Sequence, residues 1–179
     1  MSLEDFDIQE IKEDNKSKKK HLIFLLNDKR YALPLSKIKE VIRVTNITPL
    51  PGVVPFYKGL INIRGQIISV IDLRTLLGIE TQTLDAKRNA IIISQVGEIL
   101  VGAIVDKVEE VRAYDRSEMN ISDTGRMEMA GAGVYGVAKD QSGELTLLID
   151  LEKAVENTDF KTIDKEQRQG ADETEESAA

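Results

Sequence analysis

Hydrophobic residues in the middle of this chain come in short runs that polar and turn-forming residues separate. The runs are rich in Ile, Val and Leu and are about five to eight residues long, which is typical of β-strands. Residues 22–26 and 30–34 predict a first hairpin, because the Asn and Asp between them tolerate turn conformations. The pattern as a whole indicates an all-β body.

Residues 38–44 predict a further strand in which one acidic residue interrupts an apolar face. Side chains alternate across a strand, so Ile38, Glu40, Ile42 and Val44 are expected on the same face. A lone carboxylate among apolar neighbours makes Glu40 a candidate functional residue.

A second hairpin follows a loop that contains three prolines. Residues 59–64 are expected to turn at Gly65 and Gln66 into the next strand. Asp72 then precedes a short helical stretch that a glycine ends. Its carboxylate can accept hydrogen bonds from unpaired helix amides, so we predict that Asp72 is an N-cap.

The same order of elements appears a second time. Residues 90–105 resemble the first hairpin, and residues 136–151 resemble residues 59–73, ending in Ile-Asp-Leu in both copies. Asp150 therefore occupies the place of Asp72 and is predicted to cap a helix too. Two degenerate copies would build two small barrel-like sheets with a shared apolar seam. The sequence leaves open whether strands are exchanged between the copies.

The two ends of the chain differ in composition from its centre. Residues 1–20 and 157–179 contain few apolar residues and many charged ones, so we expect them to be flexible. We predict one domain, residues 21–156, because 179 residues with 41% hydrophobic content are short for two independent cores.

Composition also restricts the location and the partners of the protein. No apolar run approaches the roughly 20 residues of a membrane-spanning helix, and the acidic start does not resemble a secretory signal. With no cysteine, the cytoplasm is the expected compartment. A net charge of −7 and an aromatic content of 4% argue against a nucleic-acid partner.

Candidate motifs for chemistry are weak. Residues 131–136 match the G-x-G-x-x-G string, but they precede a predicted strand, whereas a pyrophosphate-binding loop opens a helix. The single histidine, His21, is expected to be an ordinary surface residue of the first strand. We therefore expect no catalytic residue, no cofactor and no metal site. Glu40 and the turn cation Arg64 suit either partner recognition or a solvated surface.

Residues 58–74, KGLINIRGQIISVIDLR, resemble the signature segment of the CheW-like family. The first hairpin, residues 38–41, the proline-rich loop, residues 104–108 and residues 148–151 also resemble that family in the same order. The resemblance covers about residues 20–156.

This resemblance implies two five-stranded, SH3-like barrel subdomains around a shared core. It implies a non-catalytic chemotaxis scaffold that couples the histidine kinase CheA, of a two-component system, to the cytoplasmic tips of methyl-accepting chemoreceptors. The family's receptor-coupling positions match Ile38, Glu40, Gly59 and Arg64. A stand-alone coupler is expected, because the 23 residues after Glu156 are too few for a kinase or receiver domain. A nucleotide-dependent enzyme and a barrel-type nucleic-acid binder are the alternatives.

Overall fold

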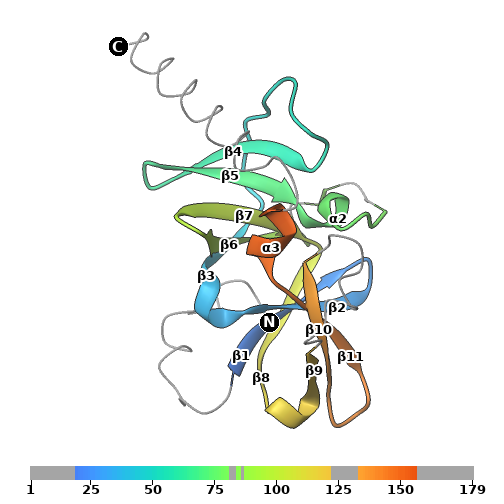
Figure 1. Cartoon of the computed structure of the whole chain (residues 1–179). Coiled ribbons are helices and arrows are strands. Elements are labelled where there is room, and N and C mark those ends of the chain that lie inside the picture. Colours follow the sequence, from blue (N-terminus) through green and yellow to red (C-terminus); the bar gives the residue numbers. More distant parts are fainter. Residues whose placement is uncertain (1–18, 81–83, 86, 122–132, 157–179) are drawn as a thin grey trace.

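Two β-sheets with short helices make up the described part of the protein (Figure 1). The computed structural model describes residues 19–80, 84–85, 87–121 and 133–156. One sheet has six strands in the order β8-β1-β2-β11-β10-β9, and the other has five in the order β3-β6-β7-β5-β4. The all-β prediction is confirmed, and the larger sheet has one strand, β9, beyond the expected five.

The elements are short, as their sequence patterns predict. The six-stranded sheet contains β1 (Lys19–Leu26), β2 (Lys29–Pro34), β8 (Lys107–Tyr114), β9 (Met119–Ile121), β10 (Val134–Lys139) and β11 (Leu145–Ile149). The five-stranded sheet contains β3 (Ile38–Arg43), β4 (Tyr57–Ile63), β5 (Gln66–Asp72), β6 (Ala90–Val96) and β7 (Ile99–Val105). The helices are α2 (Leu73–Leu76), α3 (Leu151–Glu156) and the 3₁₀ turns η2 (Leu35–Lys37) and η3 (Arg116–Glu118).

The two copies of the repeat exchange their first hairpins. Strands β1 and β2 of the first copy lie between β8 and β11 of the second copy, and β6 and β7 lie between β3 and β5. The pairings match in direction as well: β2 with β11 and β5 with β7 are parallel, whereas β1 with β8 and β3 with β6 are antiparallel. Strands are therefore exchanged between the two copies, which the sequence alone did not determine.

The largest hydrophobic cluster takes buried residues from both sheets and is the shared core. It includes Phe24 of β1, Ile92 of β6 and Val101 of β7, together with Leu73 of α2 and Leu151 of α3. Smaller clusters lie on the other face of each sheet, one around Ile91 and Ile104 and one around Ile23 and Leu148. Strands such as β1 and β6 are thus buried on both faces, which explains their unbroken apolar runs.

A close contact between chain segments recurs at equivalent places in the two sheets. Thr48 and Leu60 exchange backbone hydrogen bonds of 2.8 and 2.9 Å beside Gly59, and Gly136 of β10 pairs with Ile121 of β9. A Cβ atom built at Gly59 would lie 2.0 Å from the Thr48 carbonyl oxygen, and one at Gly136 would lie 2.9 Å from that of Asn120. Both glycines are required by backbone packing.

The flexible ends that the sequence predicts fall mostly outside the described residues. Residues 1–18 and 157–179 belong to that group, but Lys19 and Lys20 begin β1 and pair with Tyr114 and Ala113 of β8. No helix in the described ranges is long and apolar enough to cross a membrane.

Candidate functional site

Glu40 and Arg64, which the sequence marked separately, contact each other directly. The two guanidinium nitrogens of Arg64 donate to the two carboxylate oxygens of Glu40 at 3.0 and 2.9 Å. Glu40 lies on β3, one edge strand of the five-stranded sheet, and Arg64 lies in the turn that follows β4, the other edge strand. The pair therefore joins two edges that the curl of the barrel brings together.

Arg64 is held in an uncommon backbone conformation. Ile63 pairs with Gln66, so Arg64 and Gly65 are the two turn residues, with φ values of 52° and 83°. The turn begins one residue earlier than the sequence suggested. Glycine, asparagine and aspartate are the usual residues where φ is positive in such a hairpin, so an arginine there is a conformational exception. Such exceptions occur preferentially at functional sites.

The ion pair is accessible to a partner. The Arg64 side chain is 78% exposed and the Glu40 side chain 33% exposed. The hydrogen bonds that Arg64 donates to the Glu40 carboxylate raise the pKa of Arg64, so the guanidinium keeps its charge. A bidentate pair fixes the orientation of both groups, which is the geometry expected of a directional contact surface.

Ile38 does not share a face with Glu40, contrary to the prediction from strict alternation. The register between β3 and β6 shifts between Ile38 and Glu40, as in a β-bulge. Ile38 is buried in the shared core, where Val41 also packs, whereas Ile42 and Val44 pack against the smaller cluster of the five-stranded sheet. Ile38 therefore lies in the shared core instead of on the strand face of Glu40.

Asp72 and Asp150 both lie where helix amides need acceptors. The Asp72 carboxylate accepts from the Arg74 backbone N–H at 3.0 Å, and Asp150 accepts from the backbone N–H groups of Glu152 and Lys153 at 3.0 and 3.3 Å. This is the hydrogen-bond pattern of an N-cap.

Asp72 also belongs to a buried ionic network that the sequence did not reveal. Arg74 is 1% exposed, and its Nε and Nη2 atoms donate to Asp72 at 3.0 and 2.9 Å. Its Nη1 donates to Asp106 at 2.8 Å, and Asp106 also accepts from the backbone N–H of Asn27 at 2.6 Å. The hydrogen bonds of Asp72 raise the pKa of Arg74. Arg74 and Asp106 are 32 residues apart, and no local pattern links them.

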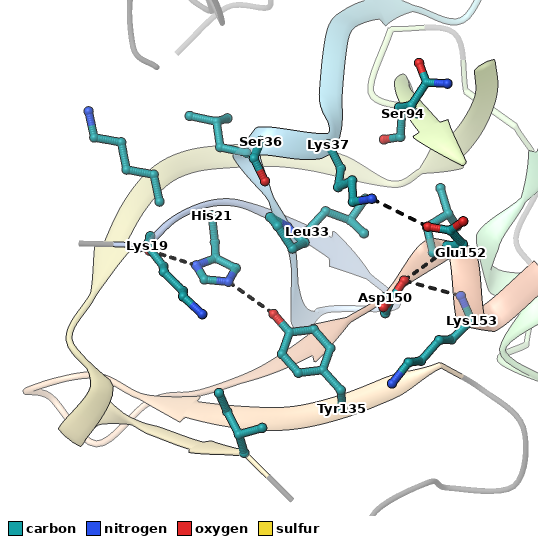
Figure 2. A pocket seen from close by; sticks show the side chains of 16 residues that line it. Lys19, His21, Leu33, Ser36, Lys37, Ser94, Tyr135, Asp150, Glu152 and Lys153 are labelled. Carbon is teal, nitrogen blue, oxygen red and sulfur yellow. Dashed lines mark hydrogen bonds and ion pairs between the residues drawn. The ribbon is translucent and has the colours of Figure 1, made fainter. Parts of the chain in front are cut away.

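His21 is buried rather than exposed, which corrects the sequence prediction. It is 2% exposed, and its ring lies 5.7 Å from that of Tyr114. Its Nδ1 faces the Lys19 carbonyl at 3.0 Å, and its Nε2 lies 3.2 Å from the Tyr135 hydroxyl, as Figure 2 shows. Both tyrosines come from the second half of the chain, Tyr114 from β8 and Tyr135 from β10, so distant segments bury the histidine.

The glycine-rich string does not lie in a phosphate-binding context. Residues 131 and 132 are outside the described residues, and residues 134–136 belong to strand β10 instead of opening a helix. Among the described residues, no three His, Asp or Glu side chains are grouped as metal ligands.

The fold and the site together define a duplicated β-barrel protein that carries an exposed, oriented ion pair on one barrel. The sequence profile of the CheW-like domain matches residues 20–159. The chain belongs to the CheW-like family.

Relatives support the same assignment. "Chemotaxis protein CheW" of Bacillus subtilis is 32% identical over 134 residues, which cover 74% of this chain and 85% of the relative. The protein of the same name from Thermotoga maritima is 29% identical over 140 residues, covering 78% and 89%. The crystal structure of the scaffolding protein TtCheW from Thermoanaerobacter tengcongensis superposes with a TM-score of 0.70 at 31% identity, covering 76% of this chain and 92% of that one.

Proposed function

We propose that this chain is a non-catalytic chemotaxis adaptor in the cytoplasm that couples the histidine kinase CheA to the tips of chemoreceptors. Its relatives are named chemotaxis proteins, and its structural neighbour is named a scaffolding protein. The single observation that carries the proposal is the exposed Glu40–Arg64 pair, which the family resemblance assigns to receptor coupling.

The pair explains how one barrel would recognise a receptor helix. Each charge holds the other in place before binding, so little side-chain freedom is lost when a receptor arrives. The free chain presents an acceptor and a donor side by side, and a receptor helix with complementary polar groups would contact both. Ile38 and Gly59 contribute by fixing the strand positions that set the pair's orientation.

Arg64→Asn is the sharpest test, because asparagine favours the positive φ that Arg64 adopts. The turn should be kept while the guanidinium is lost. We expect receptor affinity to fall by about tenfold to a hundredfold, since a charged contact is removed. CheA affinity and the melting temperature should stay close to those of the unaltered chain. Binding to a receptor fragment and to CheA is measured on the same preparations.

Two further variants separate recognition from structure. Lys139→Asn removes an exposed cation at the equivalent end of β10 and should leave receptor affinity unchanged. The exchange Glu40→Arg with Arg64→Glu reverses the pair and should stay defective if the receptor contacts each charge individually. Full receptor binding by the reversed pair, or by Arg64→Asn, would show that these residues are not the coupling site.

A further inference from the structure

A pocket of about 800 Å³ lies away from the Glu40–Arg64 pair, between the ends of β1, β2 and β10 and helix α3. Figure 2 shows Lys19 and His21 on one side of the Tyr135 ring and Asp150 and Lys153 on the other. Ser94 and Gln95 of β6 also line it, so both sheets contribute to the walls. Its size falls within the usual range of small-molecule sites.

Positive charge prevails at this pocket although the whole chain carries a net charge of −7. Four lysines line it against two carboxylates, those of Asp150 and Glu152. Both carboxylates are engaged, because Asp150 accepts from α3 amides and Glu152 pairs with Lys37 at 3.5 Å. Within the described ranges, the ammonium groups of Lys19 and Lys153 pair with no carboxylate, so they can attract an anion.

The groups deeper in the pocket carry no charge. The Lys19 carbonyl only accepts, so the His21 Nδ1 carries its proton and the Tyr135 hydroxyl donates to Nε2. Burial lowers the pKa of His21 and raises the pKa of Tyr135 to about 12, so both stay neutral near pH 7. Leu33, Leu35 and Leu151 supply buried apolar wall next to them.

Two residues of the pocket wall have a polar or apolar surface that no described residue covers or pairs with. The Ser94 hydroxyl is buried and has no hydrogen-bond partner in the described part of the chain, which is uncommon for a buried polar group. Ile121 of β9 lines the pocket and is 38% exposed, one of three large hydrophobic residues exposed among those described. The apolar surface of a ligand would cover Ile121, and an acceptor atom on it would take a hydrogen bond from the Ser94 hydroxyl.

We propose that this pocket binds a small amphipathic organic anion, with its apolar body against the leucines and Ile121 and its acidic group between Lys19 and Lys153. The uncharged interior and the cationic mouth favour this orientation over the reverse. The occupant would contact Ser94 or Gln95 of one sheet and α3 beside the other. Binding would therefore stabilise the contact between the two sheets.

The test uses the full chain and the fluorescent probe anilinonaphthalene sulfonate, an apolar ring system with one acidic group. Folded protein should bind it at one saturable site, and decanoate should displace it much better than decanol. Lys19→Gln with Lys153→Gln should weaken probe binding by about fivefold to tenfold, from the loss of two exposed charges. The matched double variant Lys107→Gln with Lys139→Gln removes the same charge outside the pocket and should bind as the unaltered chain does.

Nuclear magnetic resonance gives an independent readout that does not require either variant to be stable. Decanoate should shift the signals of Ser94 and Gln95 in β6 together with those of Leu151 and Tyr135, because these residues line one pocket. Equal loss of affinity in the two double variants, equal displacement by decanol, or shifts confined to other surfaces would each overturn the proposal. Receptor and CheA binding play no part in this test, so its outcome is separate from the adaptor proposal.

Discussion

Asp72 and Asp150 occupy equivalent positions in the two repeats, yet only Asp72 faces a buried cation. Asparagine at either position keeps a side-chain oxygen that can accept from the helix amides, so Asp72→Asn and Asp150→Asn should both retain their caps. They differ at the residue two places further on, which is Arg74 after Asp72 and Glu152 after Asp150. We therefore expect Asp72→Asn to be the far more destabilising substitution.

The magnitude follows from burial. The side chains of Asp72 and Arg74 are 3% and 1% exposed, and neutralising one partner of a buried ion pair costs about 3–5 kcal/mol. Asp106 remains 2.8 Å from Arg74 and is partly exposed, which favours the lower end of that range, about 3 kcal/mol. Asp150→Asn should cost only about 0.5 kcal/mol, because both residue types are good N-caps.

Urea unfolding followed by circular dichroism measures both free energies of unfolding. Circular dichroism is suitable because the chain has no tryptophan. Asp72→Asn combined with Arg74→Met should recover part of the loss, since the buried cation is removed with its partner. Equal losses for Asp72→Asn and Asp150→Asn would refute the reasoning and leave capping as the sole contribution of Asp72.

Two further substitutions test the surroundings of the core. Burial lowers the pKa of His21, so the unfolded chain binds a proton first as the pH falls below about 6.5, and stability should drop by up to about 1.4 kcal/mol per pH unit. His21→Gln should remove this contribution between pH 7.5 and pH 5, and an unchanged pH dependence of urea unfolding would contradict it. Gly59→Ala should lower the melting temperature several times more than Gly52→Ala, because the new Cβ meets the Thr48 carbonyl at 2.0 Å whereas nothing lies within 4 Å at Gly52. Similar shifts for both glycines would show that backbone conformation, not the clash, decides the cost.

Local patterns in the sequence were sufficient for most elements, because strands such as β6 and β7 are continuous apolar runs ended by turn residues. Details that depend on register were wrong. A shift in the pairing of β3 with β6 moves Ile38 off the face of Glu40. The pairing of Ile63 with Gln66 moves Arg64 into the turn. In both cases the pairing with a neighbouring strand determines where the residue lies, and the pattern of a single strand does not reveal that pairing.

Contacts between distant residues were beyond the reach of the sequence for the same reason. His21 is a polar residue at the start of a strand, and it is buried because Tyr114 of β8 and Tyr135 of β10 lie against its ring. In the sequence Arg74 has the pattern of an ordinary helical cation, and its hydrogen bond to Asp106 is apparent only in the structure. The candidate pair was found because both residues belong to matched motifs, but the contact between Glu40 and Arg64 was not predicted.

The exchange of hairpins also links the candidate site to the second half of the chain. Glu40 lies on β3, whose neighbour is β6, with Glu40 opposite Ile93. Arg64 lies in the turn after β4, and β4 is connected to β6 through β5 and β7. The first repeat alone therefore lacks the two strands that hold Glu40 and Arg64 at contact distance. Because β1 and β2 complete the other sheet in return, the two sheets should fold as one cooperative unit, and the charged pair should form only when both repeats are in place.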